Sequence, residues 1–209
     1  MITSKDLIKL TQKKYRREMG LCIVEGEKLV REHGTKAVAV FTRENLGRDY
    51  EKITNLETPE GILAVVPIPK SSEITFPYLV LDNIQDPGNV GTLLRTALAF
   101  GFKTVFSINS ADPFSQKVIR SAMGAQFNLN IIDGFAEIPA ESVLYIADLK
   151  GKMCEKPSGK FGLVLGNEGR GISAEIKSLP HKIVTIPLNS ATESLNVAVA
   201  GGIIMYEWK

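Results

Sequence analysis

The stretch YLVLDNIQDPGNVGTLLRTALAFGFKTVFSI, residues 78–108, decides the fold class. It opens with a run at 78–84 that is too apolar to alternate, which is typical of a strand covered on both faces. A helical segment follows at 92–101, and a second strand is predicted at 104–108. Because parallel neighbours need a crossover connection, a strand, a helix and a strand in this order predict a parallel pair.

The same alternation continues towards the C-terminus. Further apolar runs predict strands, and the segments between them predict helices: strands in 127–132, 143–148, 161–166 and 182–187, helices in 115–125 and 173–179. Strands interleaved with helices in this way predict an α/β domain with a largely parallel sheet over residues 78–209.

Residues 1–67 predict a second, smaller α/β unit. Ser4 is expected to cap a helix that runs through roughly Met19, and short strands and helices alternate after it. Between the two units, PIPKSSEITFP at 67–77 contains three prolines and two serines. We therefore predict a linker over 68–77.

Composition excludes several classes of protein. The chain has only two cysteines, Cys22 and Cys154, so it is neither a disulfide scaffold nor a multi-cysteine metal protein, and we predict no metal. No apolar run approaches the ~18–20 residues of a membrane span, and the N-terminus lacks the apolar core of a signal peptide. We expect a soluble protein of a reducing compartment, the cytoplasm.

The charge of the chain is concentrated near its N-terminus. The net charge is only +2, but residues 5–17 hold six basic side chains against Asp6 alone. Such a cluster suits a phosphate backbone, because phosphates that it neutralises release their counterions. A solvated helix face explains the same pattern equally well. The candidates for contact with a nucleic-acid backbone are Lys13, Lys14, Arg16 and Arg17.

Three polar motifs follow predicted strands, where a parallel sheet places its ligand sites. The first is the turn Asp86–Asn89 with Gly91, after which Arg95 lies one helical turn further on. The second is LVLGNEGRGIS at 163–173, where three glycines flank two charged residues. The spacing matches neither G-x-G-x-x-G nor G-x-x-x-x-G-K-[ST], which disfavours a dinucleotide-dependent enzyme.

The third motif is VTIPLNSATESLNVAVAGGI at 184–203. Thr192 or Ser194 is expected to cap a final helix that is apolar almost all the way round. Such a helix is buried on several faces, either in the core of one chain or in a subunit interface. We predict a homodimer held by this helix and the helix after Gly91, with Ile204 at the contact.

Together the three motifs resemble the SpoU family of RNA ribose methyltransferases, within the SPOUT class. The resemblance lies in Asn89-x-Gly91-x-x-x-Arg95, in LGNEGRGIS, and in IPL followed by SLNVAVA, and it covers roughly residues 78–207. The N-terminal segment resembles the substrate-binding module of many family members, which has a ribosomal-protein-like RNA-binding fold. The chain departs from the family at Ser190, where glycine is usual and where serine fits a positive-φ turn only with strain; the departure is minor, because Asn189, Thr192 and the Ser194–Leu195–Asn196 element remain.

The resemblance implies transfer of a methyl group from S-adenosylmethionine to a ribose 2′-hydroxyl. It also implies a C-terminal trefoil knot, which sequence reasoning alone would never predict. Arg95 is expected to act as a fixed positive charge beside the developing alkoxide, because a guanidinium keeps its proton. The implied catalytic residues are Arg95, Asn89, Glu168, Ser194 and Asn196. The implied cofactor cradle is Leu165, Gly166, Asn167, Ile186, Leu188 and Leu195.

The substrate stays open at this point. Ribosomal RNA is favoured because the N-terminal module resembles that of ribosomal-RNA enzymes, and transfer RNA is the alternative. A non-catalytic RNA-binding or ribosome-associated protein would use the basic N-terminal unit alone. It would have no use for the polar residues of the three motifs.

Overall fold

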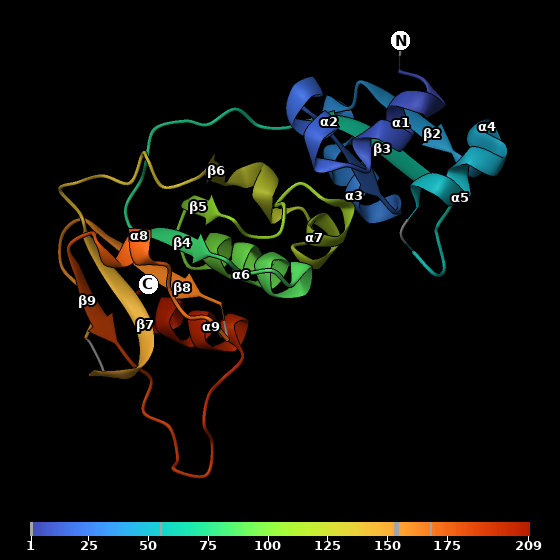
Figure 1. The fold of residues 1–209 in the computed structure, drawn as a ribbon. Helices are drawn as coiled ribbons and strands as arrows, with labels where there is room; N and C mark the ends of the chain where they lie inside the picture. The colour runs from blue at the N-terminus through green and yellow to red at the C-terminus, as the bar shows by residue number, and fades with distance from the viewer. Residues whose placement is uncertain (1, 55, 153–154, 168) are drawn as a thin grey trace.

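The computed structural model describes residues 2–54, 56–152, 155–167 and 169–209. Residues 2–67 form a three-stranded antiparallel sheet in the order β1-β3-β2, with short helices around it (Figure 1). The strands are β1 (Leu21–Glu25), β2 (Ala39–Thr42) and β3 (Ile62–Pro67). The α-helices are α1 (Ser4–Leu10), α2 (Lys13–Met19), α3 (Glu27–His33), α4 (Arg43–Leu46) and α5 (Tyr50–Ile53).

The first helix differs from the one expected through Met19. It ends at Leu10, and α2 starts at Lys13 after Gln12, whose backbone is extended. Thr3, not Ser4, is the N-cap: its side chain accepts the Asp6 N–H while the Asp6 carboxylate accepts the Thr3 N–H. A capping box therefore fixes the start of α1 one residue earlier than predicted.

Residues 78–209 form a six-stranded sheet in the order β6-β5-β4-β8-β7-β9, and every neighbouring pair in it is parallel. The strands are β4 (Tyr78–Asp82), β5 (Thr104–Ile108), β6 (Asn130–Asp133), β7 (Val143–Lys152), β8 (Phe161–Gly166) and β9 (His181–Val184). The α-helices are α6 (Pro87–Ala99), α7 (Gln116–Ser121), α8 (Ala174–Lys177) and α9 (Val197–Glu207). The predicted α/β class with a largely parallel sheet is confirmed.

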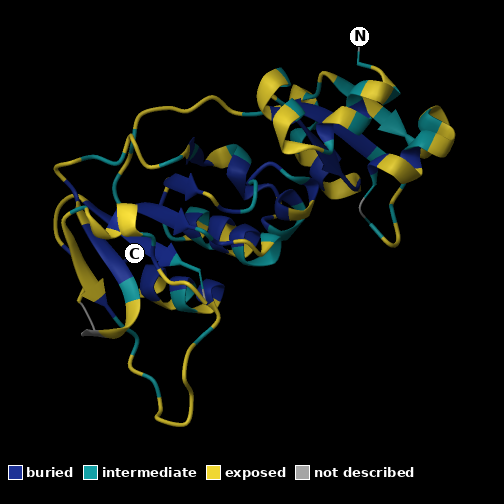
Figure 2. Ribbon diagram, in the orientation of Figure 1, coloured by how far each residue is buried: buried dark blue, intermediate teal, exposed yellow. Residues whose placement is uncertain are grey.

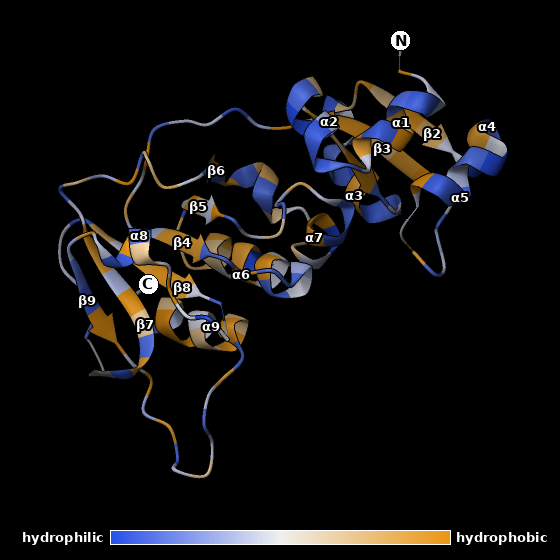
Figure 3. Ribbon diagram, viewed as in Figure 1, coloured by the Kyte–Doolittle hydropathy of each residue, from blue (hydrophilic) through white to orange (hydrophobic). Residues whose placement is uncertain are grey.

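Both faces of this sheet are covered, as the apolar runs predicted. Every residue of β4 is buried (Figure 2). One face packs against α6 and α9 through Leu79, Leu93 and Met205, and the other packs through Val80 and residues near α8. Apolar colouring concentrates on the central strands and on α6 and α9 (Figure 3). Within the described ranges, no helix has the length and apolar character needed to cross a membrane.

Helix α9 crosses the sheet so closely that only glycine fits at one position. A Cβ at Gly201 would lie 2.5 Å from Leu165 Cδ1 and 2.5 Å from Leu93 Cδ2. A Cβ at Gly202 would meet only Thr96 Cγ2, at 3.8 Å. Only Gly201 is therefore needed for the close approach of the helix to β8 and α6.

The outward face of α9 is not the one expected from the sequence. Ile204 is 4% exposed and belongs to the core, so its predicted place at a subunit contact is wrong. The apolar side chains that face solvent are Val199, Ile203 and Tyr206. A helix that is apolar all round carries no periodic signal that would identify its exposed side.

Residues 68–77 are attached to the sheet and do not hang free between the two regions. The Asn130 side chain accepts the Ser72 N–H and donates to the Ser72 carbonyl, both at 2.9 Å. The Thr75 N–H donates to Thr104 Oγ1 at 2.9 Å. This segment is therefore fixed by hydrogen bonds to the first residues of β5 and β6.

The two adjacent glycines of α9 give a matched test of this packing. Gly201→Ala and Gly202→Ala gain the same helix propensity, but only the first places a methyl group against Leu165 and Leu93. We expect Gly201→Ala to be less stable than Gly202→Ala by about 1–3 kcal/mol, the usual cost of overpacking a core. Urea unfolding of both variants measures this difference, and equal midpoints would contradict the close packing.

Candidate functional site

The first and second motifs meet where β4 and β8 end side by side. Asp82 and Gly166 are paired in the register of these strands. Just beyond them, Asn167 Nδ2 donates to the Asn83 carbonyl oxygen at 3.1 Å. Parallel neighbours end at the same edge of the sheet, so the two loops are brought together by the topology itself.

Asp82 is a residue of this site that the sequence analysis missed. Its side chain is fully buried, and it accepts the Ser173 N–H at 2.6 Å and the Asn83 amide at 2.7 Å. Ser173 stands at the N-cap of α8 as expected, but its hydroxyl makes no capping bond and finds no partner among the described residues. The signal in the sequence was an acidic residue that ends an otherwise apolar strand, since Asp is rarely buried without partners.

The second motif is a turn built around the Asn167 side chain. Its Oδ1 accepts the N–H groups of Gly169 and Arg170, both at 2.9 Å, and Gly171 N–H donates to the Asn167 carbonyl at 2.8 Å. Gly171 has φ +68°, a conformation that favours glycine. Glu168, expected in the catalytic group, lies outside the described residues.

The first and third motifs meet through two asparagines. Asn196 Nδ2 donates to Asn89 Oδ1 at 3.0 Å. Asn196, and not Thr192 or Ser194, is the N-cap of α9, because its Oδ1 accepts the N–H groups of Ala198 and Val199. Two of the predicted catalytic residues, Asn89 and Asn196, are therefore in direct contact at the N-terminal ends of α6 and α9.

Arg95 and Ser194 are placed differently. Arg95 is exposed on α6, on the same side as the exposed Thr92 and Ala99, and it makes no hydrogen bond or ion pair with any described residue. Ser194 is exposed in the segment 185–196, which projects from the body of the sheet between β9 and α9 (Figure 1). Ser194 lines the cavity described next, whereas Arg95 does not.

A cavity of about 230 Å³ opens at the ends of β7, β8 and β9, against α9. All the residues predicted for a cofactor cradle line it: Leu165, Gly166, Asn167, Ile186, Leu188 and Leu195. The part of β7 just beyond its pairing with β8 contributes further lining residues that the sequence analysis did not select: Ala147, Asp148 and Leu149. An acidic residue at the carboxyl end of a parallel strand was the available signal for Asp148.

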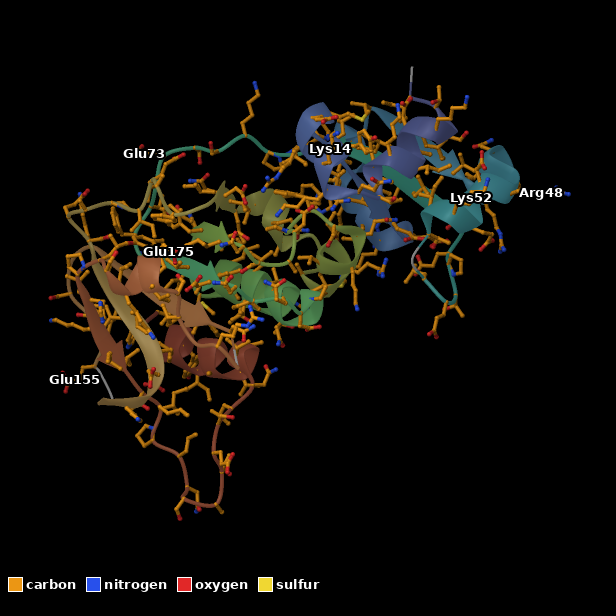
Figure 4. All side chains as sticks on the ribbon, in the orientation of Figure 1. Lys14, Arg48, Lys52, Glu73, Glu155 and Glu175 are labelled. Carbon is orange, nitrogen blue, oxygen red and sulfur yellow. The ribbon has the colours of Figure 1, made fainter. Side chains whose placement is uncertain are left out.

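The four basic candidates of the N-terminal region divide into two kinds. Lys13 and Lys14 are exposed, and Figure 4 shows Lys14 on α2. Arg16 is 5% exposed, and its guanidinium bonds the Asp112 carboxylate and the Leu10 carbonyl. Arg17 is exposed and pairs with Asp133. The predicted contact of Arg16 with RNA is thus incompatible with its burial in this ion pair.

Metal-ligating side chains are not gathered at this edge of the sheet. In the part of the chain that the structure describes, no group of three or more His, Cys, Asp and Glu side chains is arranged to hold a metal ion. The functional groups of the site are therefore amides, a buried carboxylate, an exposed guanidinium and backbone polar groups.

The chain is similar to known proteins in both sequence and structure. The model of the SpoU rRNA Methylase family matches residues 77–206. A Bacillus subtilis protein, 23S rRNA (guanosine(2553)-2'-O)-methyltransferase RlmP, is 34% identical over 232 aligned positions, which cover 97% of this chain and 94% of that protein. A TrmH-family protein from Porphyromonas gingivalis superposes with a TM-score of 0.83 at 32% identity, covering 100% of this chain and 98% of that one. The AdoMet-bound rRNA methyltransferase from Sinorhizobium meliloti superposes with a TM-score of 0.79 at 26% identity, covering 98% and 92%.

The two bonds of Asn196 can be separated by substitution. Asn196→Ala removes the N-cap of α9 and should lower the free energy of unfolding by about 1 kcal/mol. Asn196→Asp keeps the cap acceptor but cannot donate to Asn89, so its stability should stay close to that of the original protein. Thermal unfolding of both variants measures the cap, and an Asn196→Asp protein as unstable as Asn196→Ala would refute this assignment.

Proposed function

The chain belongs to the SpoU rRNA Methylase family, and we propose from this that it transfers the methyl group of S-adenosylmethionine to a ribose 2′-hydroxyl of ribosomal RNA. The observation that carries the proposal is a cavity at the carboxyl edge of a parallel sheet that the second and third motifs line, with the first motif hydrogen-bonded to both of them. Ribosomal RNA is favoured over transfer RNA because the Bacillus subtilis relative is named for 23S rRNA.

The lining of the cavity fits S-adenosylmethionine. Leu165, Ile186 and Leu188 offer apolar walls for a flat purine, and the strand ends leave backbone N–H and C=O groups to read its edge. Asp148 is the acidic side chain among the described lining residues, which suits a ligand that carries positive charge. When bound there, the cofactor supplies an electrophilic methyl group on a sulfonium.

Arg95 is the residue proposed to act on the ribose. Its guanidinium stays protonated, so it stabilises negative charge that develops on the 2′-oxygen rather than removing the proton as a base. Asn89 is held by Asn196 and by the Asp86 cap, and it is proposed to orient the substrate beside Arg95. Glu168 and Ser194 are proposed to complete the polar wall of the site.

The N-terminal region is proposed to bind the RNA. We propose residues 1–67 as an RNA-binding domain with a ribosomal-protein-like fold, 68–77 as its connection, and 78–209 as the methyltransferase domain. The exposed Lys13 and Lys14 support this division, and Arg17 is exposed beside them but pairs with Asp133. Arg16 is left out of the RNA-facing set because it is buried.

The C-terminal segment is proposed to form a trefoil knot and the contact of a homodimer. The knot is supported by the return of α9 from the edge strand β9 to the central strand β8. The dimer is supported by the solvent-facing Val199, Ile203 and Tyr206 on α9, because contiguous exposed apolar side chains mark interaction surfaces. We propose a cytoplasmic location, where ribosomal RNA is accessible.

Methyl transfer to ribosomal and transfer RNA, with labelled S-adenosylmethionine, tests the function. Arg95→Ala should lower kcat by about 10²–10³, the usual loss when one charge-stabilising group is removed. Arg95→Lys should also be slow, because a flexible point charge does not reproduce a planar fork. Cofactor affinity, titrated in parallel, should not change. Near-normal turnover of Arg95→Ala would remove Arg95 from the mechanism, whereas transfer RNA as the sole substrate would correct the substrate.

The exposed lysines of α2 give a separate test of RNA binding. Each phosphate that the protein no longer neutralises should flatten the slope of log K against log salt by about 0.7–0.9. A Lys13→Ala/Lys14→Ala variant should therefore bind RNA more weakly and with a shallower salt slope, while its cofactor affinity is unchanged. Slopes that coincide with the unmodified protein would leave these lysines as a solvated helix face.

A further inference from the structure

The N-terminal region and the parallel sheet are joined by two ion pairs, and each of them contains a side chain that is almost or fully buried. In the first, Arg16 of α2 bonds Asp112, with side chains 6% and 14% exposed. In the second, Glu25 at the end of β1 has a fully buried carboxylate that accepts from Arg120 Nη1 at 3.4 Å. Gln116 Nε2 donates to the same carboxylate oxygen at 3.4 Å.

Apolar side chains from both regions also pack against each other. Val24 and Leu29 from the N-terminal region share one buried cluster with Phe114 and Ile119 from the segment around α7. The His33 ring lies against the Phe127 ring, with centroids 4.5 Å apart. The two regions therefore share a hydrophobic core, whereas regions joined by polar, loosely packed interfaces move relative to each other by default.

The segment between the ion pairs is also bonded to the loop that begins the first motif. Ala111 N–H donates to the Ile84 carbonyl at 2.8 Å, one residue before Asp112. Ser121 Oγ donates to the Gly88 carbonyl at 3.0 Å, one residue after Arg120. Each ion pair thus lies one residue from a hydrogen bond to the loop before α6 or to the first turn of α6.

Helix α7 can reach the first motif only because Gly91 has no side chain. A Cβ at Gly91 would lie 2.4 Å from Ser121 Cβ and 2.9 Å from the Ala122 nitrogen. Helix α7 contacts both α6, which carries Asn89 and Arg95, and β1. It lies between α6 and the N-terminal region (Figure 1).

We propose that the Arg16–Asp112 and Glu25–Arg120 ion pairs are a positioning device. They hold the RNA-binding region at one orientation to Arg95, and this orientation determines which ribose of the bound RNA reaches the site. The inference rests on the proposed function. Buried ion pairs add little net stability compared with apolar packing, but removing one partner leaves an uncompensated charge. Because an unpaired buried charge is so costly, the two regions pack in the one orientation that pairs every buried charge.

Asp112→Asn and Glu25→Gln test the device, since each removes one charge and keeps the size of the side chain. Both should lower kcat about tenfold or more, or spread methylation to neighbouring riboses, because small displacements of reacting groups are costly. The Kd values for RNA and for cofactor should stay within about twofold of the unmodified protein. The Lys13→Ala/Lys14→Ala variant should behave in the opposite way, with a raised Kd for RNA.

Two further variants separate positioning from general damage. Asp133→Asn breaks the exposed pair with Arg17, which joins the same two regions, and should change neither kcat nor the methylated position. The Arg16→Gln/Asp112→Asn double variant removes both buried charges and should recover part of the kcat that Asp112→Asn loses. Folded Asp112→Asn and Glu25→Gln proteins with normal kcat and a single methylated ribose would overturn the inference.

Thermal unfolding measured by calorimetry tests the inference without RNA. The unmodified protein should unfold in one transition that includes both regions, and a folded variant with a broken buried pair should show two. Two transitions in the unmodified protein would overturn the inference even where the variants do not fold. Absence of methylation by the unmodified protein with all RNAs would instead overturn the proposed function, and the single transition would still stand.

Discussion

The Asp82 carboxylate is bonded by donors from two different loops, and the arrangement of the site depends on those bonds. A carboxylate that is buried away from water needs hydrogen-bond donors from the protein. Here the Ser173 N–H and the Asn83 side-chain amide supply them. Asn83 belongs to the loop that leads into α6, and Ser173 ends the second motif. The cost of burying one charge therefore ties two motifs together, although they are about 80 residues apart in the chain.

The fold class and the place of the site followed from local patterns. Runs such as YLVLD are too apolar for a half-exposed strand, and the polar motifs directly follow such runs. Parallel strands bring those motifs to one edge, which is why all the predicted cradle residues line one cavity. The roles of the individual side chains were implied by family resemblance and stay predictions.

Features that depend on distant partners could not be read from the sequence. Arg16 stands in a basic stretch like its neighbours, but its partner Asp112 follows 96 residues later. Residues 68–77 have the composition of a flexible linker, yet Asn130 and Thr104 bond their backbone. Ile203 and Ile204 are chemically identical neighbours in an evenly apolar helix, so only packing decides which one faces solvent.

Three arginines with the same chemistry are given different tasks by their surroundings. Arg16 and Arg120 have carboxylate partners across the boundary between the two regions, so their charges serve docking. Arg95 is exposed on α6 and has no partner among the described residues. A charge that is already paired offers little to a substrate, whereas an exposed and unpaired guanidinium attracts phosphate and stabilises a nearby anion. In the proposed function, Arg95 stays available on α6, the helix that also carries Asn89, and the other two arginines fix where Arg95 stands relative to the proposed RNA-binding region.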